Sequence, residues 1–293
     1  MGERYLGIEI GGTKLQVALG DEEGCVLERR RMDVERRRGA GRIREQLEQA
    51  IRYLCADVEP LAVGVGFGGP VDVDTGTVSL SYQVEGWADF QMRAWLEALT
   101  GLPVSVDNDA NTAALGEAVR GAGSGHRLVF YTTLGSGMGG GMVIDGRIYH
   151  GARPGESEVG LMCFDKSGAT VESRCCGWAV DARVRRHVRQ HPDGLLARLV
   201  GAESGGEARF LGPALQGGDA GARAILEETA EDIAFGLSLI GEPLRAAVAR
   251  HIPGLMTEAF KPGPQVKLAA LGEDVVCVGA LLLAREAARG GAD

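Results

Sequence analysis

The stretch YLGIEIGGTKLQVALGD, residues 5–21, consists of two apolar runs separated by two glycines, a threonine and a lysine. Each run has the length and the aliphatic content of a buried strand, so the two are predicted to pair as a hairpin. Gly11 and Gly12 would permit the positive φ angles of a tight turn and let backbone N–H groups approach an anion. Thr13 adds a hydroxyl and Lys14 a positive charge. We therefore expect this first glycine turn, residues 11–14, to bind phosphate.

The pattern of strand, glycine turn and strand returns in RLVFYTTLGSGMGGGMVIDGRIYHG, residues 127–151. Five of the seven residues 135–141 are glycine, which is more than a hairpin requires. We expect a second phosphate-binding turn here (the second glycine turn, residues 135–139), formed by Gly135, Ser136, Gly137 and Gly139. Two copies of one supersecondary unit indicate a duplicated domain. Residues 64–69 and 135–140 also match GxGxxG, but no helix follows either, which excludes a dinucleotide-binding turn.

Composition limits the class of protein. The 293 residues are 45% hydrophobic and 24% charged, as in globular proteins. The net charge of −9 argues against a nucleic-acid partner, and the arginine-rich residues 29–42 are interpreted as a solvated face because acids interrupt them. Apolar runs stay short of the ~20 residues of a membrane span. The N-terminus lacks the pattern of a secretory signal, so we expect no membrane association and a cytoplasmic location.

Further elements follow from periodicity and from glycine and proline positions. Strands are expected at 24–34, 61–68 and 102–109. Residues 201–218 are interpreted as a surface connection. The expected helices span residues 40–57, 88–100, 110–122, 178–191, 219–240, 242–251 and 278–289.

The sequence VDND, residues 106–109, ends a strand and leads into a helix. An acid at the carboxyl end of a strand in an α/β domain faces the crevice where ligands bind. Asp109 is therefore expected to face a bound ligand. The alternative is that Asp109 caps the helix, and the two roles are compatible. The amide of Asn108 offers donors and an acceptor to ligand hydroxyls.

Taken in order, these motifs resemble the ROK family, which includes bacterial glucokinases, other hexose and N-acetylhexosamine kinases, and sugar-responsive repressors. The resemblance runs from residue 5 to about residue 284. It rests on GIEIGGTK, GVGFGGPVD, VDNDANTAALGEAVRGAG, TTLGSGMGGGMVIDG, GARPGESEVG, VESRCCGWAV and LGEDVVCVGALLLA. It implies an actin-like ATPase (ribonuclease H-like) fold, in which two α/β domains close over sugar and ATP. Residues 1–118, completed by the helix at 278–289, would form one domain and residues 119–277 the other.

The resemblance also implies roles for individual residues. Asp109 would be the base that takes the proton from a hexose hydroxyl, the 6-hydroxyl group as in glucokinases, while ATP donates its γ-phosphoryl group. Glu9 would hold Mg²⁺. A homodimer is implied as well. The residues that would contact the sugar are Gly69, Gln83, Asn108, Glu158 and Glu172.

Several positions depart from the family pattern. Glu9 stands where the family usually has Asp, and Gln83 where it has Asn. Leu161 replaces a histidine, and of the cysteine cluster that follows only Cys163 remains. Structural zinc needs four N or S ligands, so no zinc is expected. The six cysteines show no CxxC spacing and are interpreted as free thiols.

The largest departure is an apparent deletion near residues 236–241. Family members place a strand and a glycine-rich turn for adenosine there, whereas this sequence runs from helix to helix. Neighbouring strands could close the gap, a partner could fill it, or the second domain could be poorly stable. The sequence thus favours an ATP-dependent sugar kinase. The alternative is a catalytically inactive sugar-binding sensor that has lost adenosine binding.

Overall fold

The computed structural model describes residues 2–81, 83–135, 137–151, 157–164, 166–238, 265 and 267–290. The chain divides into two compact units, which are described one at a time. Unit 1 comprises residues 1–131, 141–156 and 269–293, and unit 2 comprises residues 132–140 and 157–268.

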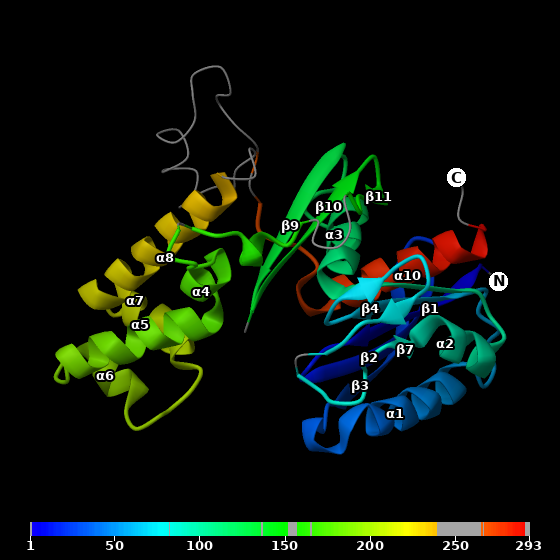
Figure 1. The fold of residues 1–293 in the computed structure, drawn as a ribbon, viewed down its shortest axis with the longest axis horizontal. Coiled ribbons are helices and arrows are strands. Elements are labelled where there is room, and N and C mark those ends of the chain that lie inside the picture. Colours follow the sequence, from blue (N-terminus) through cyan, green and yellow to red (C-terminus); the bar gives the residue numbers. More distant parts are fainter. Residues whose placement is uncertain are drawn as a thin grey trace. The chain divides into compact units, whose positions relative to one another are not determined.

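Unit 1 is built around a five-stranded sheet with the order β3-β2-β1-β4-β8 (Figure 1). Strands β1, β2 and β3 pair antiparallel, whereas β4 pairs parallel with both β1 and β8. The strands predicted in the first 110 residues are thereby confirmed. They are β1 (Arg4–Ile10), β2 (Lys14–Asp21), β3 (Val26–Asp33), β4 (Val63–Phe67) and β8 (Val104–Asn108). A separate, smaller sheet consists of β5 (Val71–Asp72), β6 (Thr77–Val78) and β7 (Phe90–Gln91).

Side chains alternate along each strand, so the five-stranded sheet has apolar side chains on both faces, and helices cover both. Leu6, Ile8 and Ile10 of β1 join one apolar core with α1 and α2, while Tyr5 packs with α10 on the other face. The helices of unit 1 are α1 (Gly39–Leu54), α2 (Met92–Thr100), α3 (Asp109–Val119) and α10 (Val275–Ala288). Within the described ranges, no helix is both long and apolar enough to cross a bilayer.

Helix α10 approaches its neighbours so closely that only glycine fits at the contact points. A Cβ on Gly64 of β4 would lie 1.9 Å from the backbone oxygen of Ala280. A Cβ on Gly279 would lie 1.8 Å from the backbone oxygen of Thr112 in α3. Part of the high glycine content therefore serves packing in the core of unit 1.

The predicted repeat of strand, glycine turn and strand at 127–151 is confirmed as β9 (Leu128–Leu134), β10 (Met138–Ile144) and β11 (Arg147–Ile148), in the order β11-β10-β9. Asp145 and Gly146 join β10 to β11 with φ angles of 52° and 78°, as a two-residue type I′ turn requires. In unit 1, Val143 and Ile148 of this sheet pack against Leu115 of α3.

The described part of unit 2 is mainly helical. Its core includes Val184, Leu196, Ala222 and Ile225. The helices are α4 (Val171–Cys175), α5 (Gly177–Gln190), α6 (Leu195–Val200), α7 (Leu211–Gln216) and α8 (Ala220–Ser238). The helix predicted at 242–251, and the segment 236–241 except for the end of α8, lie outside the described residues.

The interpretation of residues 201–218 as a surface connection is wrong. This segment contains a 3-10 helix (Glu207–Phe210) and α7, and Leu211 and Ala214 are buried in the core of unit 2. The carboxylate of Asp181 in α5 accepts hydrogen bonds from the backbone N–H groups of Gly206 and Ala208. The sequence interpretation failed because the segment is rich in glycine and has few apolar residues. The packing of those apolar residues and the hydrogen bonds to Asp181 order the segment.

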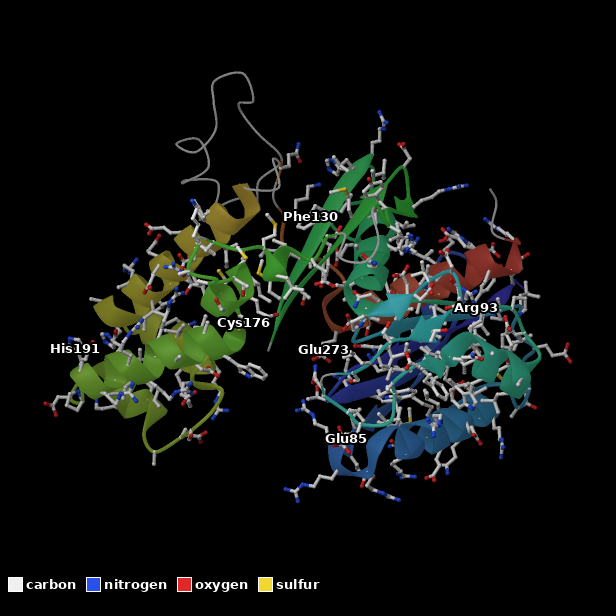
Figure 2. The ribbon with its side chains drawn as sticks, viewed as in Figure 1. Glu85, Arg93, Phe130, Cys176, His191 and Glu273 are labelled. Atoms are coloured by element: carbon white, nitrogen blue, oxygen red, sulfur yellow. The ribbon has the colours of Figure 1, made fainter. Side chains whose placement is uncertain are left out.

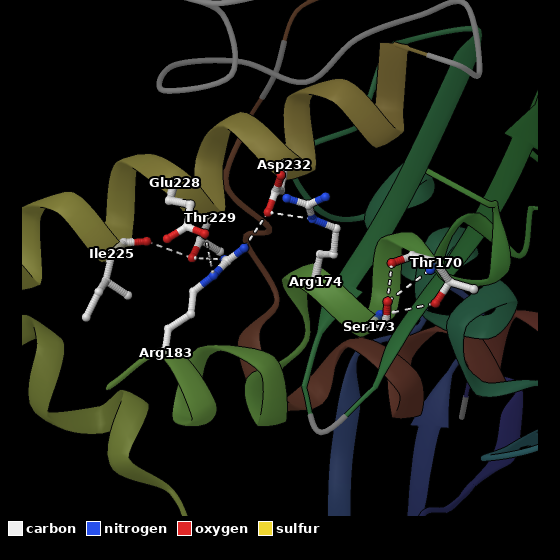
Figure 3. Close-up of polar contacts among 8 residues, drawn as sticks. All are labelled: Thr170, Ser173, Arg174, Arg183, Ile225, Glu228, Thr229 and Asp232. Carbon is white, nitrogen blue, oxygen red and sulfur yellow. Dashed lines mark hydrogen bonds and ion pairs between the residues drawn. The ribbon is translucent and has the colours of Figure 1, made fainter. Parts of the chain in front are cut away.

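A buried arginine joins α5 to α8 in unit 2 (Figure 3). Arg183 donates to Thr229 Oγ1 at 2.7 Å and pairs with Asp232 and with Glu228, the latter at 3.2 Å. Arg174 of α4 pairs with the same Asp232 at 3.2 Å. A buried guanidinium costs free energy unless its donors are satisfied, and here two acids and a hydroxyl satisfy it.

Candidate functional site

The first glycine turn follows β1 directly. Gly11 N–H donates to the backbone oxygen of Lys14 at 2.9 Å and closes the hairpin. Contrary to the sequence-based expectation, neither Gly11 nor Gly12 has a positive φ angle. Close approach explains the glycine instead, because a Cβ on Gly12 would lie 1.7 Å from Oε1 of Gln83.

Arg36 holds Gln83 against this turn. Its Nε donates to the backbone oxygen of Gly12 at 2.6 Å, and its Nη2 donates to Gln83 Oε1 at 3.1 Å. No sequence pattern indicates this role, since Arg36 lies in the arginine-rich stretch interpreted as a solvated face. The fold brings together three residues that are distant in the sequence, and Arg36 thereby places a cation beside two predicted ligand-binding residues.

Glu9, the predicted Mg²⁺ ligand, is only 7% exposed. Its Oε1 pairs with Lys14 Nζ at 3.0 Å, and its Oε2 accepts a hydrogen bond from Gln16 Nε2 at 2.6 Å. Lys14 Nζ also donates to the backbone oxygen of Glu273, which Figure 2 labels, at 3.2 Å. Because a buried carboxylate needs such compensation, Glu9 attracts cations to the end of β1.

The donor set at Glu9 fits a Mg²⁺ ion that is held together with phosphate. Mg²⁺ in such sites keeps several waters and takes one or two carboxylates plus phosphate oxygens. In the part of the chain that the structure describes, no group of three or more His, Cys, Asp or Glu side chains could hold a metal. Glu9 would thus be one ligand, with phosphate and water oxygens as the others.

A thiol completes the surroundings of Glu9. Cys277 Sγ of α10 lies 3.9 Å from Glu9 Oε2. Burial and then the nearby negative charge of Glu9 raise the pKa of Cys277 to about 12. The thiol therefore stays protonated at neutral pH and is a weak donor to the carboxylate.

The corner between β8 and α3 carries Asn108 and Asp109. Asn108 is the helix cap: its Oδ1 accepts from the N–H groups of Ala110 and Asn111 at 2.8 and 3.3 Å. The alternative that Asp109 caps the helix is therefore wrong, because Asp109 is the first residue of α3. Nδ2 of Asn108 donates to the backbone oxygen of Gly69 at 3.2 Å, which joins two predicted sugar contacts.

Gly68 links this corner to the first glycine turn. Its N–H donates to the backbone oxygen of Ile10 at 2.8 Å. A Cβ on Gly68 would lie 3.3 Å from Asp109 Oδ2 and 3.5 Å from the Cα atom of Gly11. Asp109 is half-buried and stands in the first turn of a helix, where the helix dipole favours a negative charge.

In unit 2 the second glycine turn rests on Glu172. Gly135 N–H donates to the backbone oxygen of Gly137 at 2.9 Å. Glu172 Oε2 accepts a hydrogen bond from the N–H of Met138 at 2.8 Å, and a Cβ on Gly137 would lie 2.7 Å from the same oxygen. One carboxylate oxygen of Glu172, a predicted sugar-binding residue, thus supports the turn. Ser136 lies outside the described residues.

Glu158 is followed by a segment of unit 2 that packs against the second glycine turn. It precedes a 3-10 helix (Val159–Leu161) in which a Cβ on Gly160 would lie 2.2 Å from the backbone oxygen of Met138. Leu161, which replaces the family histidine, is 63% exposed. The predicted residues therefore gather in two groups. Unit 1 holds Glu9, Gly11, Gly12, Thr13, Lys14, Gly69, Gln83, Asn108 and Asp109, and unit 2 holds Gly135, Gly137, Gly139, Glu158 and Glu172.

Comparison with known proteins identifies the relatives of this chain. A model of the ROK family matches residues 5–287. The glucokinase of Halalkalibacterium halodurans is 27% identical over 307 residues, covering 94% of this chain and 93% of the relative. The glucokinase of Streptomyces coelicolor is 30% identical over 314 residues, covering 96% and 97%.

A solved structure gives the same result for the fold. The ROK family glucokinase from Streptomyces griseus in complex with glucose and AMPPNP is 28% identical, with a TM-score of 0.78, and the match covers 97% of this chain and 99% of that one. These findings confirm the predicted fold class, the actin-like ATPase α/β fold.

Proposed function

Because the chain belongs to the ROK family, we propose that it is an ATP-dependent sugar kinase that phosphorylates a hexose, at the 6-hydroxyl group as glucokinases do. The observation that carries the proposal is the meeting of Asp109, Gly68 and the first glycine turn in unit 1. In this arrangement a general base stands beside a turn whose backbone N–H groups and lysine suit a phosphate.

The reaction assigned to this site is a direct transfer. The sugar hydroxyl oxygen attacks the γ-phosphorus of ATP, the bond from that phosphorus to the β,γ-bridging oxygen breaks, and ADP leaves. The hydroxyl proton passes to a carboxylate oxygen of Asp109. Phosphoryl transfer depends mainly on positioning and charge stabilisation. The first glycine turn would stabilise the phosphate charge, and Asp109 would position the hydroxyl and accept its proton.

Binding of the sugar is assigned to Gly69, Gln83, Asn108, Glu158 and Glu172. Asn108 keeps one N–H for a ligand after its bonds to the helix and to Gly69. Gln83 is held in place by Arg36. The carboxylates of Glu158 and Glu172 suit vicinal hydroxyls, since each accepts two hydrogen bonds.

Phosphate binding is assigned to the two glycine turns and to Lys14. Glu9 would hold Mg²⁺, which supplies charge neutralisation on the β- and γ-phosphate oxygens when it is bound. Lys14 is already paired with Glu9, so we expect the lysine to turn from that carboxylate toward the phosphates. Residues 1–118 with the helix at 278–289 would form the sugar and phosphate side, and residues 119–277 the phosphate and nucleotide side.

A coupled kinase assay over a panel of hexoses with Mg²⁺-ATP tests the proposal. We expect turnover with at least one hexose and a fall in kcat of about 10²–10⁴-fold in Asp109→Asn, which keeps the shape but removes the base. NMR of the product would locate the phosphate. If calorimetry detects sugar binding without ATP binding or turnover, the protein is a sensor and the proposal fails.

A further inference from the structure

The end of β8, directly before Asp109, carries a buried carboxylate that the proposed reaction leaves unused. Asp107 is 3% exposed. Its Oδ1 accepts hydrogen bonds from the N–H of Asn108 at 2.7 Å and from Nδ2 of Asn111 at 3.0 Å. Its Oδ2 lies 2.7 Å from Nε2 of His150. Burying a carboxylate is costly, and these three donors offset that cost.

The hydrogen bonds of Asp107 span the catalytic corner. Asn108 precedes Asp109 and Asn111 follows it, so one carboxylate oxygen fixes the chain on both sides of the proposed base. The third donor comes from beyond β11, a segment distant in the sequence. An ionised carboxylate only accepts hydrogen bonds, so Nε2 of His150 must carry the proton that it donates.

We infer that Asp107 and His150 form a positioning pair for the proposed base: His150 donates to Asp107, and Asp107 holds the corner so that Asp109 meets the sugar hydroxyl. The inference rests on the proposed function. Misplacing a reacting group by about 1 Å can cost roughly 10²-fold in rate. The expected consequence is therefore a change in kcat without a comparable change in ATP binding.

Further charges surround the pair. Glu286 of α10 is close enough to Asp107 for the two negative charges to interact, and burial together with that charge raises the pKa of Glu286. Arg147 of β11 and Arg285 and Arg289 of α10 oppose this effect. Because Glu286 brings a second carboxyl group near Asp107, the hydrogen bond from His150 offsets part of the cost of charging Asp107.

Substitutions at His150 separate positioning from packing. The amide nitrogen of Gln can reach the place of Nε2, whereas that of Asn falls short and Leu offers no donor. We expect kcat to fall about 10- to 100-fold in His150→Leu and at least fivefold in His150→Asn, but to stay within threefold of wild type in His150→Gln. The KM for ATP should stay within twofold in all three.

The pair should also act as one unit. In Asp107→Ala the loss of kcat should at least equal that of His150→Leu, and the double variant should be no worse than Asp107→Ala alone. Thermal melts identify variants that fail to fold. If His150→Leu or Asp107→Ala does not fold, the comparison of kcat between His150→Asn and His150→Gln tests the pairing. Wild-type kcat in His150→Asn, or equal losses in His150→Gln and His150→Asn, would overturn the pairing. An inactive wild-type protein would overturn the proposed function itself.

Discussion

Each glycine turn joins two consecutive strands, but the charged side chains beside the two turns differ. At the first turn, Lys14 pairs with Glu9 and Arg36 donates to Gly12. At the second, a carboxylate oxygen of Glu172 accepts the N–H of Met138. The first turn thus has two cations beside it, one of them paired with Glu9, whereas the second has the carboxylate of Glu172.

This difference implies that the two proposed phosphate sites are not equivalent. A phosphate near Lys14 and Arg36 gains attraction from both cations. A phosphate at the second turn competes with Glu172 for the N–H of Met138 and meets its negative charge. We therefore expect the first turn to contribute more to ATP binding and turnover than the second.

The largest effect is expected when the charge at the first turn is removed. Lys14→Met should lower kcat/KM for ATP about 100-fold or more, because an ammonium facing the phosphates stabilises the transition state. Lys14→Arg should have a kcat/KM for ATP at least tenfold higher than that of Lys14→Met. Steady-state kinetics with ATP as the varied substrate measures both.

The counterpart at the second turn is Glu172→Gln, whose side-chain oxygen still accepts the N–H of Met138. It should change kcat/KM for ATP less than fivefold. If Glu172→Gln costs as much in ATP kinetics as Lys14→Met, the two turns are equivalent and the comparison fails.

A smaller effect is expected from adding a methyl group to each turn. Gly12→Ala places a Cβ 1.7 Å from Gln83 Oε1 and 2.9 Å from Gln83 Cβ, so Gln83 must leave its position. The KM for the sugar should rise about tenfold as strain and a lost contact combine. At Gly135, no atom in the described ranges lies within 4 Å of the added Cβ, and Gly135→Ala should stay within twofold.

A double-mutant cycle tests the stated cause of the Gly12 effect. In a Gln83→Ala background the side chain in conflict is gone, so Gly12→Ala should cost less than threefold in KM. A full tenfold penalty in that background would mean that the backbone of the turn, and not Gln83, requires the glycine.

Much of this arrangement could be predicted from the sequence where the signal is local. The buried apolar runs of β1, β4 and β8 identify the sheet. The carboxyl ends of parallel strands β4 and β8 bring Gly69 and Asn108 together. The glycine turns are equally visible, although the reason for Gly12 is the approach of Gln83 and not the φ angle.

Other parts depend on contacts between distant residues, which no local pattern encodes. Arg36 resembles any other arginine of its charged stretch until the fold brings it to Gly12. His150 acquires a partner only when β11 packs beside α3. Asn108 and Asp109 both suit a helix cap, and only the geometry assigns the cap to Asn108.

The smallest effect is a difference in thiol reactivity between the two units. Cys277 lies against Glu9 near the first turn, and Cys163 is exposed in unit 2. Only the thiolate reacts with iodoacetamide, and a pKa of about 12 for Cys277 leaves roughly one molecule in 10⁴ as thiolate at pH 8.

Peptide mass spectrometry should find Cys163 alkylated first, with labelling of Cys277 rising as pH increases. Both should react in guanidinium chloride, where burial no longer raises the pKa. Equal rates in native buffer would mean that α10 opens from the sheet, and the support of the first turn through Glu9 would then be lost.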